Sequence, residues 1–319
     1  MEILGLLLLS AAMLILRQSV ILLLLVLMAY VHMVWGDGMI VYLIQDMWGA
    51  LDSASLLAVP LFIISGALMS RGTIAGRLIA VVRAATEWLP GGLGLAAILS
   101  CAVFAALSGS SAATLIAVGG VMYPALKEAG YSNRFAIGSV TSAGTLGILI
   151  PPSIPLILYG IVTETNIVDL FKAGMLPGLI LTLALGAYSV WANRGIARPG
   201  FSARILWRAT QEGIWALMLP VILLGGIYSG LFTPTEAAAV SVGYAVVVEV
   251  VIYRELGWRA FYGSVLSTAQ MLGTLFPIVA VALSLKTLMA VEGVPHAFAD
   301  WLQANVHSPI VFLIVVNLL

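Results

Sequence analysis

Residues 95–160 form a long apolar stretch that is interrupted twice by residues that stop helices. The first interruption, Ser-Gly-Ser-Ser, occupies 108–111, and the second, 144–153, contains two glycines and two consecutive prolines. Hydrocarbon offers no hydrogen bonds to an exposed backbone, so breaks at membrane depth must be surrounded by protein or by a polar cavity. The pattern therefore predicts a binding site inside a membrane protein.

Composition supports this class. Of the 319 residues, 62% are hydrophobic and 9% are charged, and the mean hydropathy is +1.12. A soluble domain has about 45–50% apolar and about 25% charged residues, so the chain is predicted to be a multi-pass membrane protein. Its formal net charge is zero, which gives no reason to expect nucleic-acid binding. The single cysteine, Cys101, excludes an internal disulfide.

The charges predict the topology of the chain. Most of the 14 Lys and Arg residues lie in four connections, and the positive-inside rule places these in the cytoplasm: 71–83, 127–134, 194–208 and 254–259. The other connections contain acidic residues such as Asp37, Asp46, Asp52 and Glu164, and are predicted to face outward. The apolar runs between them are 3–16, 19–35, 54–70, 135–160, 172–192, 213–231, 237–253, 262–290 and 308–319.

The first interruption predicts a re-entrant hairpin. The connections at 71–83 and 127–134 are both predicted to be cytoplasmic, so the apolar segment between them must enter the membrane and return. We expect arms at 95–107 and 112–125 with the tip at 108–111, followed by a broken helix over 135–160. Two ordinary spanning helices with kinks are the alternative.

The order of the segments predicts an inverted repeat. Three apolar helices precede an amphipathic stretch at 71–88 and then the hairpin, and three later helices precede an amphipathic stretch at 294–305 and then residues 309–319. In secondary transporters this arrangement places the binding site at the interface of the repeats. The predicted fold is an all-α, inverted-repeat secondary transporter with a re-entrant hairpin and a broken helix, whose second repeat is incomplete. On this argument we expect roughly 90 further residues, without which the chain would not transport.

Several motifs resemble those of one family, the large membrane subunit of tripartite ATP-independent periplasmic (TRAP) transporters. They are SGSSAAT at 108–114, GY at 130–131, IPPSIP at 150–155, YG at 159–160, LFKAG at 170–174, PG at 177–178 and GLFTPTEAAA at 230–239. The resemblance covers essentially the whole chain and implies a transporter of the elevator type. Some members of the family carry Asp where this chain has Thr114, so no carboxylate is available at that position.

The resemblance implies a function and a division into domains. Relatives take up C4-dicarboxylates, sialic acid or other carboxylates across the bacterial inner membrane, driven by sodium. They receive the substrate from a periplasmic substrate-binding protein and work with a small membrane subunit. By resemblance, 1–92 is scaffold with the first arm helix and 93–192 is the first half of the transport domain. Residues 193–306 are a cytoplasmic loop, scaffold and second arm helix, and 307–319 begin a second hairpin.

Candidate ligands lie at the two interruptions. Sodium prefers hard oxygen ligands, which hydroxyls and unwound backbone carbonyls supply. The predicted sodium ligands are Ser110, Ser111, Gly144, Thr145 and Gly147. An anionic substrate is stabilised by helix N-termini, and the residues predicted there are Ser111, Pro152 and Ser153. Each hydroxyl could instead bond a carbonyl of its own helix.

Other functions remain open at this point. An intramembrane hydrolase would need a nucleophile with a base, or paired carboxylates, and neither lies at comparable depth, so we expect no enzyme and no cofactor other than the coupling ion. A stand-alone ion-coupled anion symporter and a non-transporting assembly fragment are the alternatives. Of the charged residues in apolar runs, Glu249 is predicted to pair with Arg254 or to extend toward the interface, and the role of Lys286 is undecided.

Overall fold

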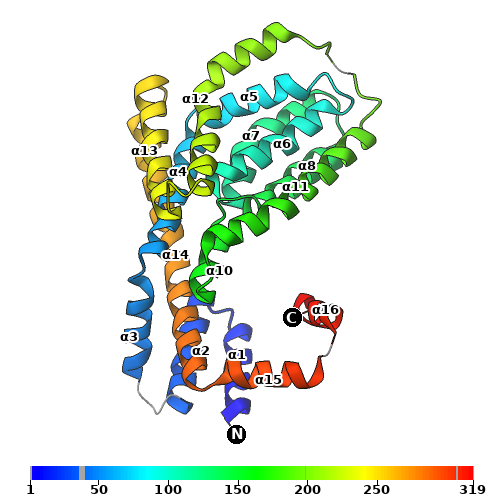
Figure 1. The fold of residues 1–319 in the computed structure, drawn as a ribbon. Helices are drawn as coiled ribbons and strands as arrows, with labels where there is room; N and C mark the ends of the chain where they lie inside the picture. Colours follow the sequence, from blue (N-terminus) through cyan, green and yellow to red (C-terminus); the bar gives the residue numbers. More distant parts are fainter. Residues whose placement is uncertain (1, 36–39, 198, 307, 319) are drawn as a thin grey trace. The chain divides into compact units, whose positions relative to one another are not determined.

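The computed structural model describes residues 2–35, 40–197, 199–306 and 308–318, and the regular elements in these ranges are all helical (Figure 1). The predicted all-α fold is confirmed. Positions 37, 198, 307 and 319, which the predictions used, lie outside the described residues. Contacts divide the chain into two compact units: unit 1 is residues 1–52 with 273–319, and unit 2 is residues 53–272.

Unit 1 contains α1 (Glu2–Ile15), α2 (Val20–Val34), α3 (Ile40–Leu51), the end of α14 (Trp258–Val291), α15 (Val294–Asn305) and α16 (Pro309–Leu318). Its buried cluster joins Met28, Leu43 and Val281. The sequence analysis assigned the region between 35 and 54 to a connection, and α3 corrects this. At 12 residues, with Asp46 and Gly49 inside it, α3 is too short and too polar to stand out as a membrane span.

Unit 2 holds both interruptions. Its elements are η1 (Ala54–Leu57), α4 (Ala58–Arg71), α5 (Ile74–Thr86), α6 (Gly92–Ser108), α7 (Ser111–Glu128), α8 (Asn133–Gly144), α9 (Leu146–Leu149), α10 (Ile154–Thr163), α11 (Ile167–Ala192), α12 (Ala203–Tyr228), α13 (Pro234–Val246), the π-helical turn η2 (Val247–Ile252) and the start of α14. α6 packs against α4, α5, α7, α8, α9, α11 and α12, and is buried along most of its length. The many Ala and Gly residues of α6 allow these neighbours to approach closely.

The predicted hairpin is present as a pair of helices. α6 and α7 are separated by a two-residue turn and pack against each other. Gly109 in this turn has φ +60°, a left-handed conformation that favours glycine. Among the described residues, six helical segments are long and apolar enough to span a membrane, and neither arm is one of them. The pair of helices is thus confirmed, and its re-entrance and the side from which it enters stay predictions.

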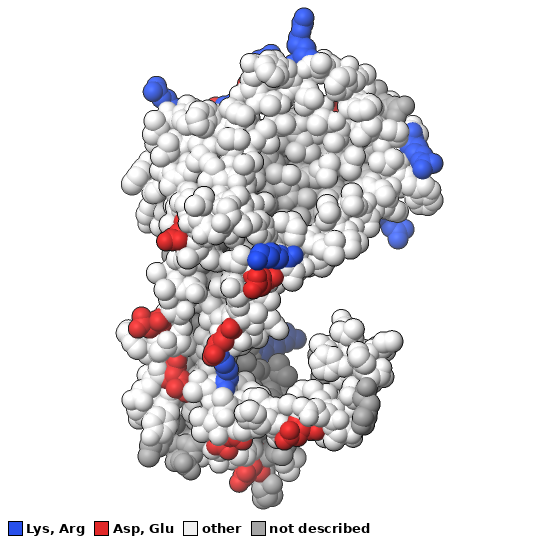
Figure 2. Space-filling view, viewed as in Figure 1, with Lys and Arg blue, Asp and Glu red and all other residues white. Residues whose placement is uncertain are grey.

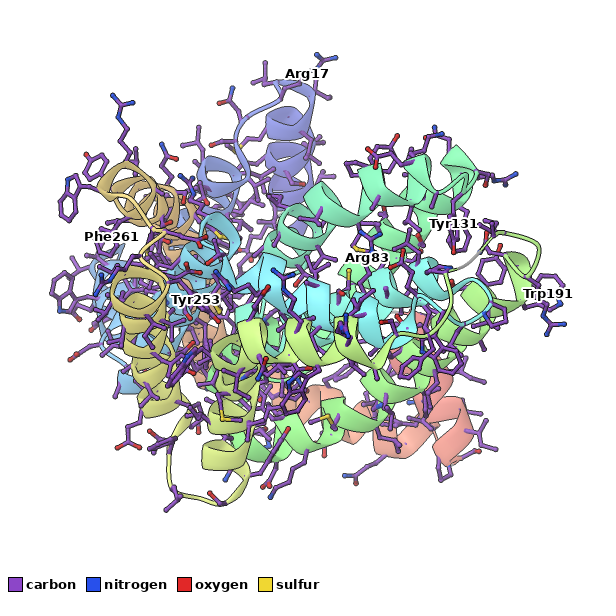
Figure 3. The ribbon with its side chains drawn as sticks, turned by 90° about the horizontal axis from the view of Figure 1, so that it is seen from above. Arg17, Arg83, Tyr131, Trp191, Tyr253 and Phe261 are labelled. Atoms are coloured by element: carbon purple, nitrogen blue, oxygen red, sulfur yellow. The ribbon has the colours of Figure 1, made fainter. Side chains whose placement is uncertain are left out.

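The surface of unit 2 is that of a membrane protein. In Figure 2 its visible face is mostly uncharged, with Lys and Arg side chains toward its margin. Figure 3 shows Tyr131 and Trp191 toward one edge of the unit and Tyr253 and Phe261 toward the opposite edge. Ring contacts lead from Tyr131 to Trp191 by way of α8 and α11. Amphipathic rings of this kind are enriched where a membrane meets water.

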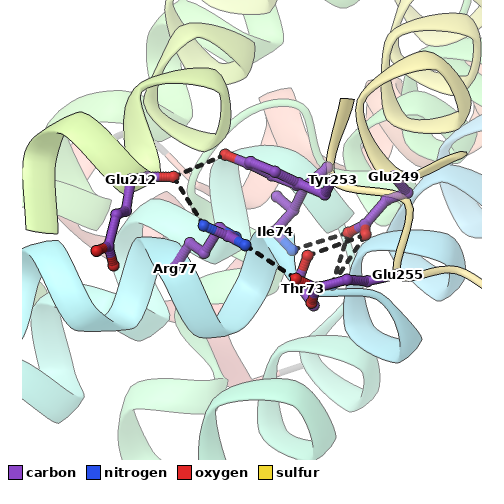
Figure 4. Close-up of polar contacts among 7 residues, drawn as sticks. All are labelled: Thr73, Ile74, Arg77, Glu212, Glu249, Tyr253 and Glu255. Atoms are coloured by element: carbon purple, nitrogen blue, oxygen red, sulfur yellow. Dashed lines mark hydrogen bonds and ion pairs between the residues drawn. The ribbon is translucent and has the colours of Figure 1, made fainter. Parts of the chain in front are cut away.

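A buried carboxyl group ties α5 to η2 (Figure 4). The side chain of Glu249 is fully buried and accepts hydrogen bonds from the backbone N–H groups of Thr73 and Ile74, at 2.8 Å each, and from the Thr73 hydroxyl at 3.2 Å. These are N–H groups at the start of α5 that a helix leaves without partners. The predicted pairing of Glu249 with Arg254 is therefore wrong, because Glu249 caps another helix and Arg254 Nε bonds the Val251 carbonyl.

Arg77 extends the same connection on α5. Its guanidinium donates to Glu255 at 3.0 Å and to the Glu212 carbonyl at 3.2 Å, and lies over the ring of Tyr253. Burial raises the pKa of the Tyr253 phenol, and the phenol donates a hydrogen bond to the Glu212 carbonyl. α5, the predicted first arm helix, is thus held to α12 and to the end of η2.

Candidate functional site

The tip of the hairpin is closed by hydroxyl groups. Ser110 caps the N-terminus of α7 by accepting a hydrogen bond from the Ala113 N–H. Ser108 and Thr114 are both fully buried, and their hydroxyl oxygens lie 3.0 Å apart. The Ser108 hydroxyl also contacts the backbone of Ser110 on both its N–H and C=O groups. The turn is therefore held by side chains of the Ser-Gly-Ser-Ser sequence itself.

The second interruption lies directly against this tip. α9 ends at Leu149, and the chain passes through a cis Pro151–Pro152 peptide before α10 begins at Ile154. The Ile154 N–H donates to the Gly109 carbonyl at 3.1 Å. A Cβ atom at Gly109 would lie 2.6 Å from the Pro152 carbonyl oxygen, so a larger residue would force the two segments apart. The hairpin turn and the helix break therefore meet backbone to backbone.

Gly147 brings α9 to the same place. A Cβ atom there would lie 2.7 Å from the Ser110 carbonyl carbon and from the Ser111 nitrogen. A Cβ atom at Gly144 would lie 3.8 Å from the Ser111 carbonyl oxygen. Gly147 therefore allows the main chain of the broken helix to approach the main chain of the tip, whereas a methyl group at Gly144 would make only an ordinary contact. The structure thus gathers four of the five residues predicted as sodium ligands: Ser110, Ser111, Gly144 and Gly147.

The serine hydroxyls at the tip differ in their partners. The Ser111 hydroxyl oxygen is buried and has no hydrogen-bond partner among the described residues. The Ser110 hydroxyl is already an acceptor for its own helix. Thr145 is exposed, and its hydroxyl donates to the Ser142 carbonyl at 2.7 Å, which is the local bonding that the sequence analysis gave as the alternative. Ser111 therefore has the most freedom to contact a ligand.

The predicted substrate residues are arranged around the same contact. Ser153 is fully buried, caps α10 by accepting from the Leu156 N–H, and donates to the Ile148 carbonyl at 2.7 Å. Pro152 is buried beside Gly109. The N-termini of α7 and α10 thus start on the two sides of the contact between the tip and the break. Such N-termini stabilise negative charge.

The chemistry available here is that of backbone carbonyls and hydroxyls. Within the described ranges, no group of three or more His, Cys, Asp or Glu side chains is placed to hold a metal ion. A hard monovalent cation can be bound without carboxylates, because carbonyl and hydroxyl oxygens suffice. Sequence reasoning did not single out the buried Ser108–Thr114 pair, although the SGSSAAT motif contains both residues.

Comparison with known proteins identifies the family. A family model described as the tripartite ATP-independent periplasmic transporter, DctM component, matches residues 3–319. The chain belongs to this family. The resemblance stated from the motifs is confirmed. Membership, together with the six long apolar helices within the described ranges, identifies a multi-pass inner-membrane protein, and the family is one of transporters rather than enzymes.

Curated relatives agree with this family. The chain is 40% identical over 287 residues to the C4-dicarboxylate TRAP transporter large permease protein DctM of Rhodobacter capsulatus, covering 84% of this chain and 65% of the relative. It is 42% identical over 267 residues to the protein of the same name from Pseudomonas aeruginosa, covering 83% and 62%. It is 37% identical over 293 residues to the ectoine TRAP transporter large permease protein TeaC of Halomonas elongata, covering 91% and 69%. The chain thus spans about two thirds of the length of these relatives.

Proposed function

We infer that this chain takes part in sodium-coupled uptake of a small organic acid across the inner membrane by an elevator mechanism. The observation that carries the proposal is the contact of the hairpin tip with the helix break, where Gly147 places α9 against Ser110 and Ser111. Two unwound segments at one point supply several main-chain oxygens, which is how secondary transporters bind coupling cations.

The substrate class follows from charge and from the relatives. C4-dicarboxylates and ectoine, which the relatives' names specify, share a carboxylate group. The N-termini of α7 and α10 begin at this contact, and the positive end of a helix dipole favours an anion. We therefore propose a carboxylate as the group recognised, as in a C4-dicarboxylate, a sialic acid or a similar compound.

The proposed partners are a small membrane subunit and a periplasmic substrate-binding protein. The names of the relatives place them in TRAP transporters, and such transporters work with both components. The proposed division of labour is that of the family resemblance, in which residues 93–192 carry the substrate and α5 and α15 belong to the part that stays in place. Alternatives are a stand-alone anion symporter and an assembly component that does not transport.

The test is uptake by the protein expressed from its natural gene, reconstituted in proteoliposomes with the small subunit and the binding protein. Labelled succinate and labelled ectoine are the probes, with an inward gradient of sodium or of potassium. We expect accumulation of at least one acid only with sodium and only with the binding protein. Uptake that is equal in both gradients would contradict sodium coupling, and uptake without the binding protein would favour the stand-alone symporter.

A further inference from the structure

A cavity of about 260 Å³ lies beside the hairpin tip, within unit 2. Its walls come from α4, from the tip with the start of α7, and from the first part of α14. The tip contributes Ser108 and Ser110, and α14 contributes Ser267 and Thr268. Pockets for drug-sized ligands occupy roughly 300–1,000 Å³, so this cavity suits a smaller molecule.

One positive charge faces this cavity. Arg71, at the end of α4, is the charged residue among the described residues that line it. The Arg71 guanidinium reaches across to α14, where it contacts the backbone at Gly263 so closely that a Cβ atom there would collide with Nη1. α4 and α14 are also joined by a hydrogen bond from the Ser264 hydroxyl to the Ala67 carbonyl at 3.3 Å. Arg71 is exposed, and its guanidinium thus lies at a wall whose two helices are joined to each other.

A second polar group in the cavity lacks a partner. Thr268 is 5% exposed, and its hydroxyl oxygen has no hydrogen-bond partner among the described residues. Buried polar groups in proteins are nearly always hydrogen-bonded, and an exception calls for a ligand, a water or an ion. A hydroxyl that can donate, in a cavity that Arg71 also lines and whose described lining contains no acidic residue, makes a site for an anion.

We propose that Arg71 and Thr268 form an anion subsite that binds a carboxylate of the transported acid on the α4 and α14 side of the hairpin tip. This proposal rests on the proposed function and adds residues outside both interruptions to the binding site. The guanidinium provides a charged donor pair that matches a carboxylate, and the Thr268 hydroxyl provides a further donor. Ser108 and Ser110 place the ligand against the tip, next to the main-chain oxygens proposed for sodium.

A purely local role for Arg71 must be distinguished from this one. A cation in the last turn of a helix is stabilised by the helix dipole, and an Arg near a helix end can extend toward the membrane interface. Either role would make Arg71 matter for stability and topology. Neither would make the cavity select anions, so the test must measure the selectivity of the cavity itself.

The experiment introduces Ser267→Cys in the cavity wall and compares two thiol reagents of opposite charge, sulfonatoethyl and trimethylammonioethyl methanethiosulfonate. Cys101, the native cysteine, is fully buried, so the parent protein serves as the blank. We expect the anionic reagent to react faster relative to an exposed reference cysteine. In Arg71→Gln the ratio of anionic to cationic rates should fall by roughly tenfold. Arg71→Lys, which keeps the charge, should retain most of the preference.

The matched control is Arg259→Gln. Arg259 lies on α14, four residues before Gly263, is exposed and does not line the cavity. The charge change is the same, so the rate ratio at Ser267→Cys should stay within about twofold of the parent value. An equal fall of the ratio in both variants would overturn the proposal, since a diffuse surface potential would then explain it. An unchanged ratio in Arg71→Gln would overturn it as well.

Protection and uptake connect the cavity with the substrate. Succinate should slow the labelling of Ser267→Cys, succinamide should not, and Arg71→Gln or Thr268→Val should weaken the protection at least tenfold.

In uptake, the same two variants should raise the KM for the acid while leaving the apparent sodium affinity of the remaining transport within about twofold. If the parent transports and both variants keep its KM, the subsite is wrong and the proposed function stands. If no acid is transported, the proposed function fails, and the thiol rates still decide the charge of the cavity.

Discussion

Gly147 is the position at which the broken helix and the hairpin tip are closest. We predict that Gly147→Ala destabilises the protein by about 1–3 kcal/mol and abolishes sodium-dependent uptake, because the new methyl group would lie 2.7 Å from the Ser110 and Ser111 backbone. The control is Gly138→Ala on α8, where a Cβ atom meets nothing within 4 Å. That change should leave the free energy of unfolding equal or increase it, by up to about 1 kcal/mol. Thermal unfolding and uptake check both variants, and equal behaviour would contradict the close contact.

Ser110 and Ser111 are adjacent but should respond differently to removal of the hydroxyl. Ser111→Ala is expected to raise the sodium concentration for half-maximal uptake several-fold with little change in unfolding temperature, because its hydroxyl has no hydrogen-bond partner in the part of the chain that the structure describes. Ser110→Ala should also raise this sodium concentration. In addition it should lower the free energy of unfolding by about 1 kcal/mol, because it removes the cap of α7. Ser132→Ala, which removes a similar cap from α8, controls for the loss of a cap alone. Unaltered sodium dependence in both tip variants would refute the assignment.

At the scale of elements, the contact between Glu249 and the start of α5 has a testable role. Glu249→Gln should destabilise the protein by about 1–3 kcal/mol, because three donors of Thr73 and Ile74 would compete for one acceptor oxygen. Gly72→Ala should act similarly, because its methyl group would collide with the Glu249 carboxyl group. Hydrogen exchange at Thr73 and Ile74 measures the effect directly.

The control for this contact is Glu87→Gln, at the residue that directly follows α5. Glu87 makes a surface ion pair with Arg83, with N–O distances of 2.8 and 2.9 Å, and such pairs contribute little. Glu87→Gln should leave exchange at Thr73 and Ile74 unchanged. If Glu249→Gln also leaves it unchanged, the cap does not hold α5. If both variants accelerate exchange equally, loss of net charge rather than the cap is responsible.

The elements were predictable where local sequence decides them. The hairpin arms, the broken helix and the amphipathic helices α5 and α15 follow from helix stoppers and from apolar periodicity, and were predicted. α3 was missed because its 12 residues carry too weak a signal. The partner of Glu249 was missed because Thr73 lies 176 residues away in the chain, whereas Arg254 is nearby in sequence. Contacts between residues that lie so far apart in the sequence depend on how the helices pack.

At the scale of the whole molecule, the orientation in the membrane is still a prediction from charge. Cysteines introduced singly as Asp46→Cys and Glu164→Cys should react with an impermeant thiol reagent added outside intact cells. Cysteines introduced at the predicted cytoplasmic positions should not react: Arg83→Cys, Lys127→Cys and Arg204→Cys. The buried Cys101 keeps the background low. Outside labelling at position 127 would refute the re-entrant hairpin, because both of its ends must lie on one side.

The candidate site was predictable in its residue types and less so in its geometry. The two interruptions in the sequence predicted where the backbone leaves the helix. The structure brings Ser110, Ser111, Gly144 and Gly147 together. The sequence alone could not decide that the Thr145 hydroxyl donates to the Ser142 carbonyl of its own helix. Arg71 was interpreted only as part of a basic connection, because its place beside the tip depends on how α4 packs against the hairpin and α14.

The meeting of the tip and the break through main-chain atoms also bears on how such a protein can change over generations. Every amino acid carries the same carbonyl group, so a site made of main-chain oxygens is insensitive to most single substitutions as long as the glycines at the contact are kept. The wall formed by Arg71 and Thr268 is made of side chains, and one codon change alters its charge or its hydrogen bonds. Under the proposed function, mutation can therefore change which acid binds at that wall while the coupling ion stays the same.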